Sequence, residues 1–322
     1  MRKKPFYLLC AFLYLTVGCK KNGTPKTSPV CNDSVTTVWA KSVTATNEEV
    51  RDIDVQHFHN IHVDDADHVY TIGYASYNAD LDPGSGVFIM PAGYFHFLQK
   101  LDANGSFLWA KGIKHGVETF YNNPIATDKS GNVYIKEDEN KVVKISPSGN
   151  NLWEKVFDGY VYDLAIDKDD NIVVAGKFYK QVDFDPGAGT FYLQTDKESD
   201  FVLKLNNGGN FIWAVKAGSK THSPFTHDAV KLAIDNNSNI FVTGAFDGTV
   251  DIDPGEATYI LTRNYDQIYE SDNYLLKLNS NGNFIWANKK EVDFGSKEMN
   301  IATDASGNVY SSILVKTGTD LD

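Results

Sequence analysis

The sequence predicts an all-β protein built from repeated four-stranded antiparallel sheets, and three observations lead to this prediction. A tryptophan-centred motif recurs along the chain, and two kinds of short polar turn recur with it in a fixed order. The aromatic share is 13%, a composition that favours strands. With 322 residues, 42% of them hydrophobic, the chain can bury a substantial core.

The tryptophan motif marks one strand of each unit, and all five tryptophans of the chain occupy the same place in it. Before each of the four later copies stand an apolar strand and a turn rich in Gly and Asn, which accept positive φ. The copies lie at 37–41, 107–111, 151–155, 211–215 and 284–288, and the turns at 102–106, 146–150, 206–210 and 279–283.

A second hairpin precedes this pair of strands in each unit, and its turn begins with an aspartate. Short apolar segments stand on both sides of that turn, so each unit contains four strands, A to D, in two linked hairpins. These turns are Asp64–His68, Asp128–Asn132, Asp167–Asn171, Asp235–Asn239 and Asp304–Asn308.

The units are interpreted as blades of a β-propeller. Strands such as Phe211–Ala214 are apolar on both faces, which suits sheets packed between neighbouring sheets. A β-solenoid or a tandem sandwich is the alternative, but solenoid coils are shorter and sandwiches would not recur so regularly. The complete units span about 58–112, 124–157, 162–217 and 229–289.

A fifth blade is predicted from residues 300–322 together with an N-terminal strand at 36–43, which would close the ring and cover an exposed edge. The sequence Asp-x-Asp-Pro-Gly begins eleven residues into strand B of three units, at Asp80, Asp183 and Asp251. The same spacing from Val309 reaches Asp320, where the sequence stops two residues later. We therefore expect a truncated chain, with five blades if it is complete and more if it is not.

The N-terminus resembles a bacterial lipoprotein signal peptide. A basic start is followed by an apolar stretch, Phe6–Val17, that is too short to span a bilayer. It ends in Leu15–Cys19, which is similar to a lipobox, although Thr16 departs from the usual leucine. The resemblance implies cleavage after residue 18, acylation of Cys19 and a location at the outer membrane or cell surface. An ordinary secretory signal is the alternative.

Residues 19–35 are expected to form a flexible polar tether, and 36–322 the propeller. With Cys10 in the signal and Cys19 acylated, Cys31 alone would remain, so no internal disulfide framework is expected. The formal net charge is −12, or −15 without the signal's three basic residues, and a surface of this charge excludes nucleic acid as a partner.

The repeats themselves resemble a known family. Trp-Ala-Lys, the Asp-x-x-Gly-Asn turns and Asp-x-Asp-Pro-Gly are similar to the SBBP β-propeller repeats of bacterial surface and secreted proteins, from about residue 36 onward. The resemblance implies a propeller fold and no general activity.

Binding is expected on the face formed by the B–C and D–A connections, because these vary in length and chemistry whereas the A–B and C–D turns are nearly uniform. The aromatic side chains there suit recognition of carbohydrate or protein, or alternatively pack the loops onto the blades. The candidate binding residues are Tyr94, Phe95, Tyr121, Tyr160, Tyr192, Phe225 and Tyr259.

The Asp-x-Asp pairs are candidate calcium ligands, because carboxylates two residues apart on a strand share one side. The alternative is that each aspartate caps its turn by accepting nearby N–H groups. The pairs are Asp80 and Asp82, Asp183 and Asp185, and Asp251 and Asp253. A transition-metal site at His57, His59 and His62 is a weaker hypothesis.

No nucleophile elbow, zinc-protease motif or phosphate-binding glycine loop is present in the sequence. The A strands carry small residues, such as Ala126 and Ala165, where an enzyme should focus acids or bases. The sequence therefore favours an envelope-anchored binding or scaffold module over a glycan hydrolase or lyase, with a structural part of a larger envelope complex as a third hypothesis.

Overall fold

The computed structural model describes residues 57–75, 79–90, 96–113, 123–220, 230–263, 271–290 and 300–312, together with three two-residue strands nearer the N-terminus. Regular structure in these ranges is entirely β, in four antiparallel four-stranded sheets and several two-stranded ones. Among the described residues, no helix has the length and hydrophobicity needed to cross a bilayer.

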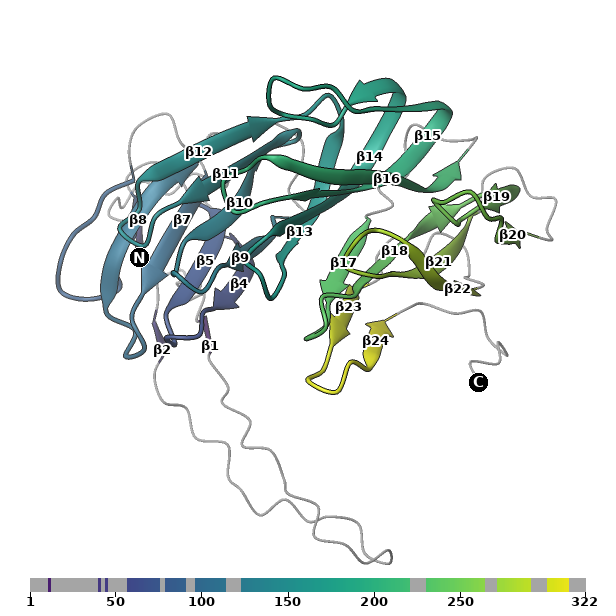
Figure 1. Ribbon diagram of the computed structural model, residues 1–322. Coiled ribbons are helices and arrows are strands. Elements are labelled where there is room, and N and C mark those ends of the chain that lie inside the picture. Colours follow the sequence, from purple (N-terminus) through teal and green to yellow (C-terminus); the bar gives the residue numbers. More distant parts are fainter. Residues whose placement is uncertain are drawn as a thin grey trace, which may run out of the picture.

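Each complete sheet is one blade with its strands in chain order from the inside outward (Figure 1). Blade 1 contains β4 (His57–Val63), β5 (Val69–Tyr74), β7 (His96–Leu101) and β8 (Phe107–Ile113). Blade 2 contains β9 (Ile125–Thr127), β10 (Val133–Asp138), β11 (Lys141–Ile145) and β12 (Asn151–Val156).

Blade 3 contains β13 (Tyr160–Ile166), β14 (Ile172–Asp183), β15 (Tyr192–Leu205) and β16 (Phe211–Lys220). Blade 4 contains β17 (Lys231–Ile234), β18 (Ile240–Phe246), β21 (Asp272–Leu278) and β22 (Phe284–Lys290). The A strands β4, β9, β13, β17 and β23 (Asn300–Thr303) adjoin one another in that order, so the sheets turn about a common axis, as expected for a β-propeller.

The core lies between the blades, in layers shared by neighbouring sheets. One layer joins Tyr134 and Val142 of blade 2 to Leu164 and Val174 of blade 3, and a second joins blade 3 to blade 4. Strands B and C are buried on both faces, as β5, β7 and β18 show. The expectation that strand D is also covered on both faces was wrong. It is the outermost strand, and Ile212 is 42% exposed beside the partly buried Trp213.

The recurring tryptophan fastens blades 1, 2 and 3 each to the next blade. The indole Nε1 of Trp153 donates to the carbonyl oxygen of Asn207, in the C–D turn of blade 3, at 3.1 Å. Gly209 of that turn has φ +77°, and a Cβ there would stand 3.2 Å from the indole and 2.7 Å from Lys155 Cε. Equivalent bonds run from Trp109 to Pro147 and from Trp213 to Ser280. The motif therefore recurs because each blade needs this contact with its neighbour.

The fifth unit is described only through β23 and β24 (Val309–Ser312), which pair with each other. Near the N-terminus, β1 (Ala11–Phe12) pairs with β2 (Ala40–Lys41), and β3 (Thr44–Ala45) pairs with β6 (Ala79–Asp80). The residues that would show strand 36–43 completing the fifth blade lie largely outside the described ranges, as do Cys19, the tether and Asp320. Ring closure, the anchor and truncation remain predictions.

Candidate functional site

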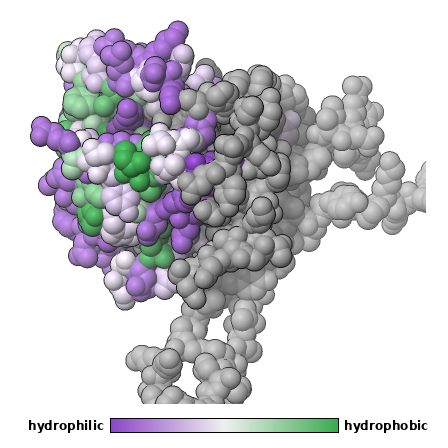
Figure 2. All heavy atoms as spheres, turned by 90° about the vertical axis from the view of Figure 1, so that its right-hand side faces the viewer, coloured by the Kyte–Doolittle hydropathy of each residue, from purple (hydrophilic) through white to green (hydrophobic). Residues whose placement is uncertain are grey.

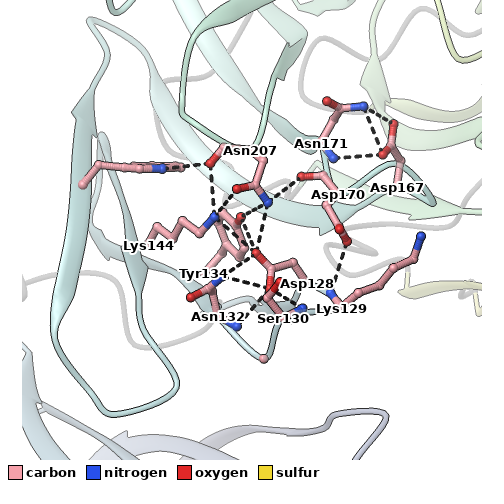
Figure 3. A network of polar contacts seen from close by, with 12 residues as sticks. Asp128, Lys129, Ser130, Asn132, Tyr134, Lys144, Asp167, Asp170, Asn171 and Asn207 are labelled. Carbon is pink, nitrogen blue, oxygen red and sulfur yellow. Dashed lines mark hydrogen bonds and ion pairs between the residues drawn. The ribbon is translucent and has the colours of Figure 1, made fainter.

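The end of the propeller that carries the A–B and C–D turns holds a buried polar network (Figure 3). The carboxylate of Asp128 lies 3.2 Å from the Nζ of Lys144, and both side chains are almost completely buried. Tyr134 and Asn207 also donate to the same carboxylate oxygen, at 3.0 and 3.1 Å. Asn207 comes from the C–D turn of blade 3, so the network joins two blades.

This network is satisfied by the protein itself. Burial alone would raise the pKa of Asp128, but hydrogen bonds from Asn132, Tyr134 and Lys144 hold it below its usual value. An Asp–Lys pair recurs at the same place in other blades, at 2.7 Å between Asp167 and Lys204 and 3.8 Å in blade 4. A group that recurs in blades 2, 3 and 4 is explained by the fold, so we assign this end a structural role.

The Asp-x-Asp-Pro-Gly segments lie at the opposite end and close the extra hairpins of blades 1, 3 and 4. In blade 3, Asp183 Oδ1 accepts the backbone N–H groups of Asp185 and Phe191 at 3.0 and 2.8 Å. Asp185 Oδ1 accepts the N–H of Gly187 at 2.8 Å. The same bonds recur at Asp80 and Asp82, and at Asp251 and Asp253. These carboxylates therefore cap their own loops.

Calcium binding by these pairs stays a prediction. Among the described residues, no group of three or more His, Cys, Asp or Glu side chains is placed to hold a metal ion. His59 lies against His96 with ring centroids 6.0 Å apart, whereas His62 Nε2 is 2.8 Å from Thr127 Oγ1. The two histidines thus face different neighbours, and the side chain of His57 is outside what the structure describes.

An aromatic residue eight positions after each loop aspartate packs on the first residue of strand D in the same blade. The ring pairs are Phe88 with Phe107, Phe191 with Phe211 and Tyr259 with Phe284, with centroids 4.8–5.3 Å apart. Blade 2 has no such hairpin, and there strand D begins with Asn151 and carries Glu154 where the others carry a buried alanine. Blades with the extra hairpin therefore begin strand D with the phenylalanine on which the hairpin packs, and the blade without the hairpin lacks that phenylalanine.

Some of the predicted binding aromatics pack on strand D, and others are exposed. Tyr259 packs on Phe284 while remaining 40% exposed, whereas Tyr160 and Tyr192 are each 56% exposed. Tyr94, Phe95, Tyr121 and Phe225 lie outside the described residues. Figure 2 shows the side of the molecule around blade 4, where apolar residues are scattered among hydrophilic ones rather than gathered in one patch.

A group of charged residues that the repeats do not share lies at this same end, between blades 2, 3 and 4. We call it the inner charged cluster and define it by Lys136, Glu139, Tyr162, Asp163 and Lys231. Lys136 is 3% exposed, and its Nζ stands over the Tyr162 ring, 5.9 Å from the centroid. The carboxylates of Glu139, Asp138 and Asp163 lie near enough to this ammonium group to influence its pKa.

The charges of the cluster perturb one another. Burial lowers the pKa of Lys136 to about 8, against the opposing influence of Glu139. Burial raises the pKa of Asp163, and Lys231 partly offsets this. Asp163 Oδ1 and Oδ2 accept the backbone N–H groups of Leu164 and Leu232 at 3.0 and 3.1 Å. Asp163 therefore ties the start of β17, and Lys231 with it, to blade 3.

A neighbouring pair of blades is joined by a second polar group that is fully satisfied. Lys177 Nζ lies 2.8 Å from Glu198 Oε1 and 3.8 Å from Asp200 Oδ1, and Tyr274 of blade 4 donates to Asp200 Oδ2 at 2.7 Å. Burial would lower the pKa of Lys177, but Asp200 and Glu198 raise it above its usual value. Lys136 and Lys100 are buried to a similar extent, and each stands over a tyrosine ring, 5.9 and 4.9 Å from the centroid.

The sequence interpretation missed the inner charged cluster, although one signal could have revealed it. Eight residues after the A–B turn aspartate, the other complete blades carry Ile72, Ala175 and Thr243, all fully buried. Blade 2 carries Lys136 at that position. Aligning the repeats would have shown that blade 2 carries a lysine where the other complete blades carry an uncharged residue.

Comparisons with known proteins support the repeat and leave the finer family open. No protein-family model matches the chain. A curated relative, the uncharacterized WD repeat-containing protein L264 of Acanthamoeba polyphaga mimivirus, is 32% identical over 113 residues. That match covers 33% of this chain and 8% of the relative. A propeller-type repeat is thus supported, and the SBBP assignment stays a prediction.

Solved structures with a similar arrangement are distant. A Bacteroides caccae protein of unknown function is 13% identical, with 80% of this chain and 88% of that chain covered and a TM-score of 0.36. The Pan2 WD40 domain of Neurospora crassa is 11% identical, with 81% and 74% covered and a TM-score of 0.38. BamB from Moraxella catarrhalis is 14% identical, with 77% and 99% covered and a TM-score of 0.23.

Proposed function

We propose that this chain is an exported, lipid-anchored β-propeller that acts as a binding or scaffold module for protein or glycan. In this proposal Cys19 carries the anchor, and the face formed by the B–C and D–A connections contacts the partner. The propeller gives a rigid scaffold on which connections of different length and chemistry can be displayed.

The difference between the two ends of the blades carries the proposal. The A–B and C–D turns repeat nearly the same hydrogen bonds, such as those of Asp128 and Asp167, and satisfy their polar groups internally. The opposite end holds exposed tyrosines at 160 and 192 and the inner charged cluster, none of which recurs from blade to blade. Because the fold does not require side chains that differ from blade to blade, these side chains are available to contact a partner.

A glycan array and a pull-down from detergent-solubilised envelopes test the binding role. The double substitution of Tyr160→Ala and Tyr192→Ala alters two exposed rings at the proposed face, and Asp169→Ala alters an exposed residue of an A–B turn as the control. We expect the double variant to lose the captured ligand and the control to retain it. Capture that survives the double variant and is lost in the control would place binding at the other end.

The anchor is tested separately by Cys19→Ser. The wild-type chain should enter the detergent phase of a temperature-induced detergent partition, because acyl chains bury many CH₂ groups at about 0.8 kcal/mol each. The variant should remain in the aqueous phase or keep its signal peptide. A detergent-phase signal that is equal for both chains would reject lipidation at Cys19.

A further inference from the structure

The polar network between blades 2 and 3 differs from its equivalents in one residue. In three blades the C–D turn presents a carbonyl oxygen to the tryptophan of the preceding blade, and that oxygen belongs to Pro147, Asn207 or Ser280. A buried Asp–Lys pair lies beside Asn207, and a second one lies beside Ser280. Of these turns, the one at Asn207 adds a side-chain amide to the pair, so the repeat does not explain the amide.

The amine of Lys144 lies directly against this amide. Its Nζ is 2.5 Å from Asn207 Oδ1 and 3.2 Å from the backbone carbonyl oxygen of the same residue. Because a C=O bond is about 1.2 Å long, Nζ is at most about 3.7 Å from the amide carbon Cγ, close to the separation of about 3–3.5 Å in a near-attack arrangement. The fold therefore holds a nucleophile beside an amide carbon.

Asp128 connects the two groups through a single carboxylate oxygen. Its Oδ2 lies 3.2 Å from Lys144 Nζ and 3.1 Å from Asn207 Nδ2. The amide of Asn132 and the hydroxyl of Tyr134 donate to the same oxygen at 2.9 and 3.0 Å, which fixes its position. One oxygen is thus placed to accept a proton from the amine and to pass it to the amide nitrogen.

Burial favours the transfer of that proton. The side chains of Lys144 and Asp128 are 4% and 0% exposed, and the pair rests in its charged form, since hydrogen bonds hold the pKa of Asp128 below its usual value. Burial penalises charged groups, so a neutral amine beside a neutral acid costs less here, relative to the ion pair, than it does in water. Because a lysine attacks as the neutral amine, one internal proton shift supplies the nucleophile.

The surroundings of Asn207 Nδ2 suit its departure as ammonium. An amide nitrogen carries two hydrogens, yet three acceptors lie near this one. They are Asp128 Oδ2 at 3.1 Å, the hydroxyl oxygen of Tyr134 at 3.3 Å and the backbone carbonyl oxygen of Asp170 at 3.3 Å. Ammonium has hydrogens enough for all three. Asn207 itself is only partly buried, so solvent reaches the residue that the ammonium leaves.

We propose that Lys144 and Asn207 form an intramolecular amide bond that ties blade 2 covalently to blade 3. Asp128 accepts a proton from the Lys144 ammonium, the neutral Nζ attacks Cγ of Asn207, and the Cγ–Nδ2 bond breaks as the Cγ–Nζ bond forms. Of the three hydrogens on Nζ, one stays in the new amide. The other two pass through Asp128 to Nδ2, which departs as ammonium, and Asp128 returns to its carboxylate form.

The reaction consumes no oxidant, reductant or added reagent, and it does not depend on the proposed binding function. The arrangement supplies orientation, which lowers the barrier of a reaction between groups that are already in contact. The bond would hold the two blades together when the hydrogen bonds of the network break, and a cross-link that closes a long loop also restricts the unfolded chain.

Tryptic peptide mapping of the purified full chain by mass spectrometry tests the bond. Trypsin does not cleave after an acylated lysine, so we expect residues 142–155 joined to residues 205–216, at the summed mass of the two peptides less one NH₃. Lys144→Arg keeps the charge without the nucleophile, and Asn207→Ser gives the turn the residue that blade 4 carries, so both should yield unlinked peptides. Lys204→Arg, at the equivalent lysine of blade 3, should retain the link.

Two results for the folded wild type would overturn the bond. One is a map with residues 145–155 and 205–216 as separate, unmodified peptides. The other is a free 205–216 peptide in which Asn207 has become aspartate, because water instead of Lys144 would then have attacked Cγ. The wild-type map decides the bond even if a variant fails to fold, and circular dichroism identifies such a variant.

The part played by Asp128 has its own test. Asp128→Asn removes the proton acceptor while keeping a side chain of similar size, and we expect it to yield unlinked peptides. A link that forms as completely in Asp128→Asn as in the wild type would overturn the assignment of Asp128 as the proton carrier.

Discussion

The two ends of the blades solve the problem of buried charge in different ways. At the A–B/C–D end, Asp128 and Lys144 neutralise each other within a network that blade 3 completes. At the B–C/D–A end, Lys136 is equally buried but faces an aromatic ring instead of a carboxylate. Buried polar groups that recur from blade to blade hold the propeller together, whereas a buried charge found in a single blade needs another explanation.

The largest effect is expected from breaking the repeated network. Asp128→Ala should lower the free energy of unfolding by about 3–5 kcal/mol, because it leaves Lys144 buried without its carboxylate. Asp169→Ala, which removes an exposed partner of Lys168, should change it by less than about 1 kcal/mol. Urea titration measures both, and equal effects would show that burial does not distinguish the pairs.

The next effect is a pH dependence specific to Lys136. Its folded pKa of about 8 lies below the value of about 10.4 expected when unfolded, so the unfolded chain binds more protons between these values. The wild type should therefore gain stability relative to Lys136→Met as pH rises from about 8 to 10, by up to about 3 kcal/mol.

Stability curves of the two proteins across this pH range provide the measurement, and tyrosines with raised pKa in other blades, such as Tyr70 and Tyr274, contribute equally to both. Parallel curves would mean that burial does not lower the pKa of Lys136 in the folded protein.

The tryptophan contact between blades gives a smaller effect with a matched control. Gly209→Ala places a Cβ against Trp153 and Lys155 at φ +77°, and should cost about 2 kcal/mol or more. Gly248→Ala has a similar φ of +61° with open space around it, and should cost only about 1 kcal/mol. Thermal or urea unfolding that ranks the two in the reverse order would contradict the contact.

The hairpin aromatics should show a pairwise coupling. In a double-mutant cycle, Phe191→Ala and Phe211→Ala should interact by about 1 kcal/mol, because each ring packs on the other at 4.8 Å. The cycle of Phe191→Ala with Phe284→Ala, which lies in blade 4, supplies the uncoupled reference. Additive effects within blade 3 would leave Phe191 free for a role in binding.

The smallest effect concerns the Asp-x-Asp loops. Asp183→Asn keeps a side-chain oxygen that can accept the N–H groups of Asp185 and Phe191, so stability should fall by less than about 1 kcal/mol. Capping alone also predicts a melting temperature that does not change with chelator or added Ca²⁺. A chelator-dependent drop that disappears in Asp183→Asn would instead establish a calcium site.

Much of the fold could be predicted because it is periodic. Five tryptophans in one motif, turns with Gly at the position that needs positive φ, and aspartates at the A–B turns are local requirements, so they are visible in the sequence. Hairpins form between neighbouring segments, and their turn chemistry is written in a few consecutive residues. The repeat therefore determined the β-propeller fold and the order of strands within each blade.

The candidate site could be predicted only in part, because its contacts join residues from different blades. The sequence placed binding at the B–C/D–A face and singled out Tyr160. It also proposed the loop aspartates and Tyr259 as site residues, but Asp251 accepts a hydrogen bond within its own loop and Tyr259 packs on Phe284. Tertiary structure decided that Lys136 of blade 2 stands over Tyr162 of blade 3, near Lys231 of blade 4.

The physical reason is the range of the interactions. A strand or turn is fixed by residues a few positions apart, whereas desolvation and charge pairing depend on every group that the folded chain brings near, whatever its distance in sequence. The sequence by itself determined which segments form blades and the order of strands within each blade. Only the packing of blade against blade decided which buried charges form ion pairs and which stand over an aromatic ring instead.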